Sequence, residues 1–137
     1  MKILGISAGQ HCCGITLIDN GKIIFSLEEE RHNRIKVYKD FYSNVFRAPY
    51  LSLKDATDKL GFNINDVDYV TSYYPKKESE IIWDTLKTGL PFPENKFIFI
   101  DHHDSHAATA YYLSGFDEDT LVVTMDASGG EYSAKYF

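Results

Sequence analysis

The chain has 137 residues, of which 44% are hydrophobic and 25% are charged, and its formal net charge is −6. This length is enough for one domain with a hydrophobic core. An acidic balance without a basic stripe argues against nucleic acid as the main partner. The apolar start is too short for a signal peptide, and no run of apolar residues is long enough to span a membrane. The adjacent cysteines Cys12 and Cys13 cannot staple distant segments, so we expect a reducing, cytoplasmic location.

Three β-type segments open the chain. KILGISA (2–8) and GITLIDN (14–20) are apolar and β-branched, and the loop GQHCC joins them. The pair Asn20-Gly21 predicts a two-residue hairpin turn into a third strand, KIIFSLEE (22–29). Residues 30 to 50 are rich in charged and aromatic residues without clear periodicity, which indicates an ordered loop or short helices.

The rest of the chain alternates strands and helices. A helix is predicted from Ser52, with Asp55 as a weak capping box and Gly61 at its end. The further expected elements are a strand at 65–74, a helix at 79–87, a strand at 96–101, a helix from about 103 to 113 ending at Gly115, and strands at 121–127 and 131–137. Three antiparallel strands followed by crossovers predict an α/β fold with a mixed sheet covered by helices.

Three of the five histidines lie within the segment IFIDHHDSHAATAYYLSGF, at positions 102, 103 and 106. His102 and His106 are four residues apart, so they share one helix face and can hold one metal ion. The pattern is not that of a zinc protease, because HExxH needs a glutamate where His103 stands. Asp126 follows the next strand and is a candidate third ligand, and iron or manganese accepts such a set. The competing interpretation is that these histidines are solvated polar residues at a helix start.

Two glycine-bearing turns lie between predicted strands. SAGQHCCG (7–14) and DASGGEYS (126–133) can each aim backbone amides at a phosphate group. Each is also explained as an ordinary turn that needs positive φ. The segment EEERHNRIK (28–36) is explained equally well as a solvated run of charges.

Together these segments resemble the N-terminal part of the carbamoyltransferases that tailor antibiotics and nodulation factors. That region is similar to the metal-dependent threonylcarbamoyl-transfer proteins of tRNA modification. The matching segments are ILGISAGQHCCGITLIDNGKI, LEEERHNRIK, DHHDSHAATAYYLSGF and VVTMDASGGE. The resemblance implies a ribonuclease-H-like mixed sheet of the actin, hexokinase and heat-shock-chaperone superfamily. Residues 1–117 would form the first lobe, and 118–137 the opening hairpin of a truncated second lobe.

The resemblance also implies a set of site residues. His102, His106 and Asp126 would bind Fe(II) or Mn(II), and the ion would hold the phosphates of ATP. The two turns would cradle the nucleotide, through Ser7, Gly9 and Gln10 in the first turn and Ser128, Gly129 and Gly130 in the second. His11 would lie near the carbamoyl group, Lys36 would face carbamoyl or phosphate oxygens, and His11 or His103 would take the acceptor proton. Where the family has a small polar residue or aspartate after this histidine, the chain has Cys12-Cys13.

The implied reaction is ATP-assisted transfer of a carbamoyl group from carbamoyl phosphate, through a carbamoyl adenylate, to a hydroxyl of a small-molecule acceptor. Because the second lobe has only begun at Phe137, we expect association with a missing C-terminal segment or a partner chain. Two alternatives stay open. One is a tRNA-acting threonylcarbamoyl-transfer relative, and the other is a non-catalytic module that binds metal and nucleotide.

Overall fold

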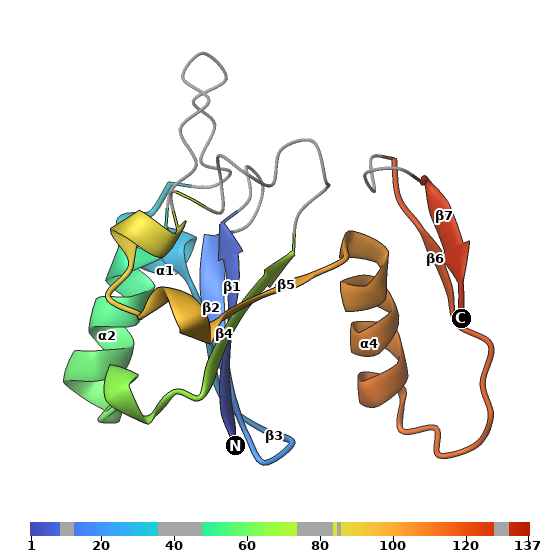
Figure 1. Ribbon diagram of the computed structural model, residues 1–137, viewed down its shortest axis with the longest axis horizontal. Coiled ribbons are helices and arrows are strands. Elements are labelled where there is room, and N and C mark those ends of the chain that lie inside the picture. The colour runs from blue at the N-terminus through green and yellow to red at the C-terminus, as the bar shows by residue number, and fades with distance from the viewer. Residues whose placement is uncertain (9–12, 36–47, 74–83, 85, 128–131) are drawn as a thin grey trace. The chain divides into compact units, whose positions relative to one another are not determined.

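The computed structural model describes residues 1–8, 13–35, 48–73, 84, 86–127 and 132–137 (Figure 1). Its elements are β1 (Lys2–Ala8), β2 (Cys13–Asp19), β3 (Lys22–Glu28), α1 (Glu29–Asn33), α2 (Tyr50–Leu60), η1 (Ile64–Asp66), β4 (Tyr69–Tyr73), η2 (Glu94–Lys96), β5 (Phe97–Ile100), α4 (His102–Ser114), β6 (Val123–Met125) and β7 (Ala134–Tyr136). The chain divides into two compact units. The first comprises Met1–Ser72 and Ile81–Ile98, and the second comprises Tyr73–Glu80 and Phe99–Phe137.

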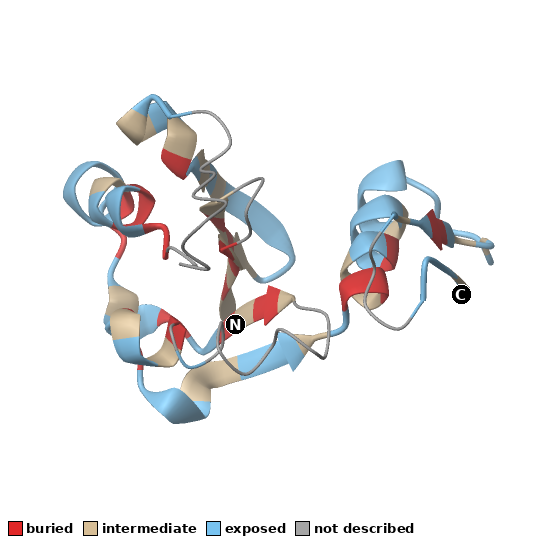
Figure 2. Ribbon diagram, turned by 90° about the horizontal axis from the view of Figure 1, so that it is seen from above, coloured by how far each residue is buried: buried red, intermediate tan, exposed pale blue. Residues whose placement is uncertain are grey.

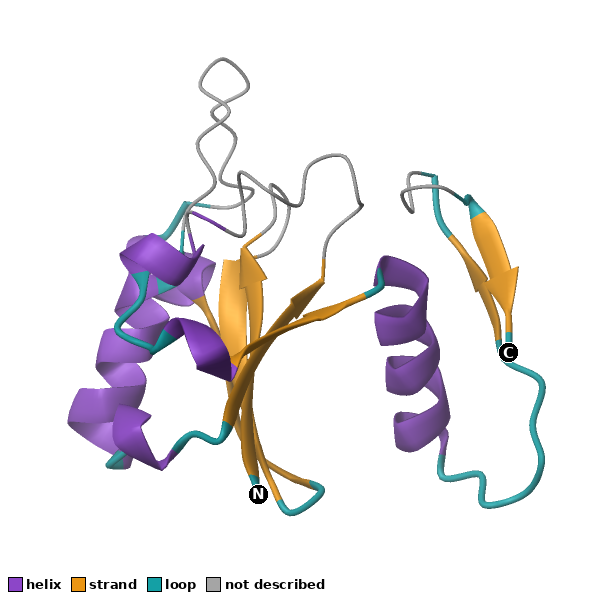
Figure 3. Cartoon of the chain, viewed as in Figure 1, coloured by secondary structure: helices purple, strands orange, loops and turns teal. Residues whose placement is uncertain are grey.

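The larger sheet has five strands in the order β3-β2-β1-β4-β5 (Figure 3). β1 is antiparallel to β2, β2 is antiparallel to β3, and β1 is parallel to β4. A second sheet contains only the antiparallel strands β6 and β7. These pairings confirm the predicted α/β class with a mixed sheet and flanking helices. The assignment to a ribonuclease-H-like, actin-type lobe stays a prediction, as does the lobe boundary after residue 117.

The first hairpin forms as its sequence predicts. Asn20 and Gly21 both adopt positive φ, 47° and 79°, which is the backbone of the tight turn that suits the twist of the two strands. A close approach requires another glycine, Gly14, where β2 passes β3. A Cβ atom at this position would lie 2.5 Å from the backbone oxygen of Leu27. The glycine at the end of SAGQHCCG is therefore needed for strand packing, whatever the loop binds.

The core of the first unit lies on one face of its sheet. Strand register places Leu4 beside Leu17 and Val70, and the next row places Ile6 beside Ile15. All five side chains are buried, and the buried residues gather in the central strands (Figure 2). Because side chains alternate between the two faces of a strand, each row buries several apolar side chains at once. The sequence predicts β1 and β2 from their apolar, β-branched residues, and the structure adds which of these side chains face the core.

The helix α2 begins two residues before the position that the sequence predicts. Its N-cap residue is Pro49, which provides no capping side chain, and Gly61 ends it with a φ of 67° as predicted. The cap comes instead from Glu29 in α1. Its buried carboxylate accepts hydrogen bonds from the backbone N–H groups of Leu51 and Ser52, at 2.9 and 2.8 Å, and from the Ser52 hydroxyl at 2.8 Å. The predicted capping box of Ser52 and Asp55 is therefore wrong.

Other predicted boundaries shift by a few residues. The strand predicted at 65–74 begins at Tyr69, because η1 precedes it. The helix predicted at 79–87 falls mostly outside the described residues, although residue 84 and residues 86–89 are helical. The last two strands are shorter than predicted. In the described part of the chain, none of the helices combines the length and apolar character that a bilayer span requires.

Candidate metal centre

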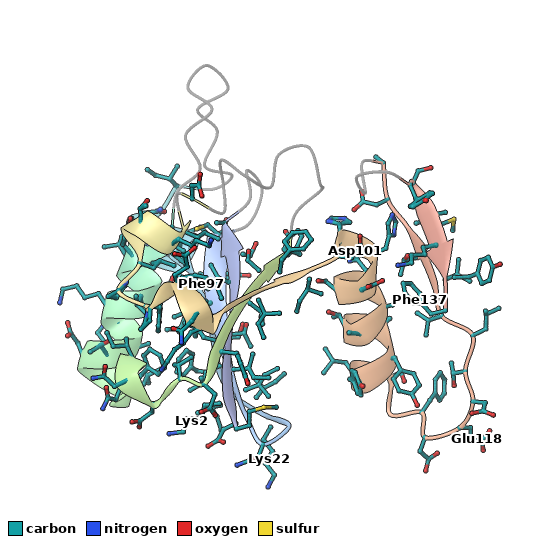
Figure 4. All side chains as sticks on the ribbon, viewed as in Figure 1. Lys2, Lys22, Phe97, Asp101, Glu118 and Phe137 are labelled. Carbon is teal, nitrogen blue, oxygen red and sulfur yellow. The ribbon has the colours of Figure 1, made fainter. Side chains whose placement is uncertain are left out.

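The second compact unit places the histidine cluster at the start of α4, directly after β5. Asp101 caps this helix, and its carboxylate accepts hydrogen bonds from the backbone N–H groups of His103, at 3.0 Å, and Asp104, at 3.2 Å. In Figure 4 the labelled Asp101 marks this end of the helix. The helix ends at Gly115, which adopts a φ of 77°. The cap explains why the helix begins at His102 and therefore why all three histidines lie in its first two turns.

Three side-chain atoms converge between α4 and β6. The Oδ2 atom of Asp126 lies 2.8 Å from Nε2 of His102 and 3.3 Å from Nε2 of His106. The two Nε2 atoms are 3.1 Å apart. His102 and His106 point the same way because they are one helical turn apart. The structure thus brings together the three residues that the sequence proposes as metal ligands.

The spacing of these atoms fits a transition-metal ion. Three ligands that share a face of an octahedral ion at about 2.1 Å lie about 3.0 Å from one another, and ligands of a tetrahedral ion lie about 3.4 Å apart. The observed separations of 2.8, 3.1 and 3.3 Å are centred on the octahedral value. Two imidazoles and one carboxylate are a donor set that iron and manganese accept, with further positions open. The residues present therefore fit the ion that the resemblance implies.

The surroundings of the three residues differ. His102 is buried, whereas the side chain of His106 is 53% exposed and that of Asp126 is 33% exposed. The centre is therefore accessible from the side of His106 and Asp126. The ring of Tyr73 lies 5.2 Å from that of His102, centroid to centroid. The Nδ1 atom of His102 is buried, and no described residue forms a hydrogen bond with it.

His103 points elsewhere. It is 1% exposed, and both of its ring nitrogens form hydrogen bonds inside the unit. Nδ1 lies 2.7 Å from the hydroxyl of Thr124, and Nε2 lies 2.8 Å from the backbone carbonyl of Tyr132. A base that takes a proton from a substrate must reach that proton. The predicted catalytic role of His103 has no support in this geometry.

Lys135 of β7 forms a second connection between the hairpin and the start of α4. Its ammonium group donates a hydrogen bond to Asp104 and lies 3.7 Å from a carboxylate oxygen of Asp101. The hydrogen bond with Asp104 raises the pKa of Lys135 above its ordinary value. All three side chains are partly exposed to solvent, so this ion pair contributes little to the free energy of unfolding.

The other predicted site residues divide between described and undescribed segments. Ser7 lies in β1, opposite Gly14 of β2. Burial raises the pKa of the neighbouring Cys13 thiol to about 12, and the charge of Glu29 adds to the effect. The remaining predicted residues lie outside the described part of the chain and stay predictions: Gly9, Gln10, His11, Lys36, Ser128, Gly129 and Gly130.

Sequence reasoning missed two residues that shape this centre, Thr124 and Lys135. Thr124 lies in β6, two positions before Asp126, and residues two apart in extended chain point to the same side. That spacing is a signal that could have identified Thr124 as a neighbour of the histidines. Lys135 carries no such signal, because its contact with α4 depends on the register of β7 against β6.

Comparison with known proteins identifies the family of the chain. A family model described as "Carbamoyltransferase N-terminus" matches residues 2–83. Nodulation protein NolNO of Sinorhizobium fredii (strain NBRC 101917 / NGR234) is 26% identical over 147 residues, an alignment that covers 90% of this chain and 20% of that protein. Uncharacterized protein sll1178 of Synechocystis sp. (strain ATCC 27184 / PCC 6803 / Kazusa) is 27% identical over 164 residues, covering 93% of this chain and 25% of that protein.

The chain thus spans a quarter or less of the length of these two curated relatives. The matched region of the family model, residues 2–83, is more than half of the 137 residues. The chain belongs to the carbamoyltransferase N-terminus family.

Proposed function

We propose that this chain is the metal- and ATP-binding N-terminal part of a carbamoyltransferase. The complete catalytic unit would move a carbamoyl group from carbamoyl phosphate, through a carbamoyl adenylate, to a hydroxyl of a small-molecule acceptor. Family membership supports the transferase class. The observation that supports metal and nucleotide binding is the convergence of His102, His106 and Asp126, with ligand atoms 2.8 to 3.3 Å apart.

His102, His106 and Asp126 would hold Fe(II) or Mn(II). When bound, such an ion supplies positive charge for the phosphate oxygens of ATP. The chain's own contribution is to fix the three ligand atoms. Asp101 holds the first turn of α4 in place, and the burial of His102 keeps water from one side of the centre. The exposed side, at His106 and Asp126, leaves room for phosphate groups.

In the proposed reaction, water first cleaves carbamoyl phosphate into carbamate and inorganic phosphate. An oxygen of the carbamate then attacks the α-phosphorus of ATP, which forms the carbamoyl adenylate as pyrophosphate leaves. The acceptor oxygen then attacks the carbamoyl carbon and AMP leaves. A base must take the acceptor proton. Of the two histidines predicted for this role, His103 has both ring nitrogens in hydrogen bonds within the unit. We therefore propose that His11, a residue of the first glycine-bearing turn of the sequence, takes this proton.

Two measurements on the purified chain test this proposal. The first is binding of a non-hydrolysable ATP analogue with and without Mn(II), compared between wild type and Asp126→Asn. The second is pyrophosphate release from ATP with and without carbamoyl phosphate. We expect binding that depends on Mn(II) and is lost in Asp126→Asn. Release that depends on carbamoyl phosphate, from this chain or after addition of a partner segment, would support the transferase.

The alternatives make different predictions in the same experiment. Metal-dependent nucleotide binding without release, even when a partner segment is supplied, would indicate the non-catalytic module. Tight binding of tRNA would indicate the threonylcarbamoyl-transfer relative. Nucleotide binding that is insensitive to both Mn(II) and Asp126→Asn would contradict the proposed role of the centre.

A further inference from the structure

His103 lies between the two proposed metal ligands of α4 and is 1% exposed. The partners of its ring are a carbonyl and a hydroxyl. A backbone carbonyl can only accept a hydrogen bond, so Nε2, which lies 2.8 Å from the carbonyl of Tyr132, carries a hydrogen. Nδ1 lies 2.7 Å from the Thr124 hydroxyl, which also donates to the carbonyl of Lys135 at 3.3 Å. Both ring nitrogens of His103 are therefore engaged in hydrogen bonds.

Its two partners flank the carboxylate of the centre. Thr124 lies in β6, and Asp126 directly follows this strand, two positions on. The contact of Thr124 with His103 therefore lies next to that of Asp126 with His102. The other partner, Tyr132, precedes Ser133. The carbonyl of Ser133 accepts a hydrogen bond from the backbone N–H of Asp126 at 2.8 Å. His103 thus contacts the chain on both sides of the turn that begins at Asp126.

We propose that His103 is a positioning residue that sets the distance of Asp126 from His102 and His106. The inference rests on the metal site of the proposed function. α4 and the hairpin come from separate parts of the chain, so contacts between them must place the carboxylate on the two imidazoles. Lys135 makes the other polar contact of this kind described above, but its ion pair is exposed and screened by solvent. The hydrogen bond of His103 with Thr124 is buried, and that with Tyr132 is partly buried.

The geometry also explains why two adjacent histidines have different roles. Consecutive residues on a helix point about 100° apart, so His102 and His106 face Asp126 while His103 faces Thr124. Partners that orient metal ligands from the second layer around an ion are worth about tenfold to a hundredfold in metal affinity. We expect the contacts of His103 to have an effect of this size.

Three substitutions separate the two contacts. Thr124→Val keeps the shape of the side chain and removes the hydroxyl. In His103→Asn the side-chain amide takes the place of Nδ1 beside the Thr124 hydroxyl, whereas in His103→Gln the amide nitrogen replaces Nε2 as the donor to the carbonyl of Tyr132. Thr57→Val is the matched control, because it removes a hydroxyl from α2 in the first unit, where its partner is the carbonyl of Leu53.

Affinity for Co(II) and the visible absorption spectrum of the bound ion are measured on the folded 137-residue chain. We expect Thr124→Val and His103→Asn to weaken Co(II) binding about tenfold or more and to change the spectrum, since the ligand geometry changes. His103→Gln should lose less affinity than His103→Asn if the contact with Tyr132 dominates. Thr57→Val should match wild type in both measurements.

The outcomes distinguish a positioning role from a merely structural one. If the variants unfold at lower temperature but bind Co(II) with wild-type affinity and spectrum, this inference is overturned while the proposed metal site stands. If wild type binds no Co(II), the proposed metal site itself fails. A second readout needs no metal: the Nε2–H of His103 should give a slowly exchanging signal in the ¹H–¹⁵N spectrum of the apo protein. Absence of that signal would also overturn the inference.

Discussion

The carboxylate of Glu29 should be worth several kcal/mol, because it caps a helix that lacks a cap of its own. In the Glu29→Ala variant, the buried N–H of Ser52 loses its partner, at a cost of about 1–3 kcal/mol. The N–H of Leu51 is only partly buried and can bond to water, so loss of the cap there costs about 1 kcal/mol. The expected loss in the free energy of unfolding is therefore about 3 kcal/mol, or roughly 10 °C in Tm.

The isosteric variant Glu29→Gln should lose less, about 1–2 kcal/mol, because its amide oxygen can replace Oε2 as the acceptor for the two Ser52 groups, although the NH₂ group then faces the N–H donor of Leu51. Glu30→Gln is the matched control. It changes the adjacent glutamate of the same segment, and we expect an effect within about 0.5 kcal/mol.

Thermal unfolding followed by circular dichroism measures the change in Tm. Hydrogen exchange at the backbone amides of Leu51 and Ser52 measures how well the start of α2 is protected. Faster exchange of these two amides in Glu29→Gln, but not in Glu30→Gln, is the expected result. Equal melting temperatures for both variants, with unchanged protection of the Ser52 amide, would refute the assignment of Glu29 as the cap of α2.

Two further predictions concern the first unit. Gly14→Ala should lower the free energy of unfolding by about 1–3 kcal/mol, because its Cβ would lie 2.5 Å from a backbone oxygen. Gly5→Ala is the control and should cost clearly less, because its Cβ would meet nothing closer than 3.7 Å. Equal losses of stability in the two variants, measured by thermal denaturation, would contradict this prediction. With Cys12 replaced by serine, Cys13 should react with iodoacetamide at about pH 8 roughly a thousandfold more slowly than in the urea-unfolded chain, since its pKa rises from 9.0 to about 12. Because the thiol has a higher pKa in the folded than in the unfolded chain, its contribution to the free energy of unfolding is fully present below pH 9.0. This contribution should be lost as the pH rises from 9.0 toward 12. A rate within tenfold of the unfolded chain would show that the thiol is not protected.

Local patterns predicted the first hairpin and the helix α4 well. Apolar, β-branched runs predicted β1 and β2. The pair Asn20-Gly21 predicted the turn into β3, because such a turn depends on only two residues. The start of α4 also depends on a nearby residue, Asp101. Where the cap, the turn or the apolar run lies within or next to the element, the sequence is sufficient to find that element.

The start of α2 could not be predicted in this way. Its cap, Glu29, lies 23 residues before Ser52 in the sequence, so no local pattern contains both. The interpretation of LEEERHNRIK as a functional or solvated segment therefore missed that one of its glutamates is structural. Among the described residues of this segment, Glu29 is the buried one.

The candidate centre could likewise be predicted only in part. Helical periodicity identified His102 and His106 as neighbours, and the position of Asp126 after the next strand added the third residue. The different orientation of His103 depends on how the hairpin lies against α4, which the sequence does not specify. The partners Thr124 and Tyr132 are 21 and 29 residues away along the chain.

Metal titration of the wild-type chain and its ligand variants tests the central claim most directly. Mn(II), Co(II) and anaerobic Fe(II) are titrated against wild type, His102→Ala, His106→Ala and Asp126→Asn. His32→Gln is the control, because this histidine lies beside Asp55 in the first unit. The account predicts about one ion per wild-type chain, loss of binding in all three ligand variants, and unchanged affinity in His32→Gln. No binding by wild type, or binding that survives all three ligand substitutions, would contradict it.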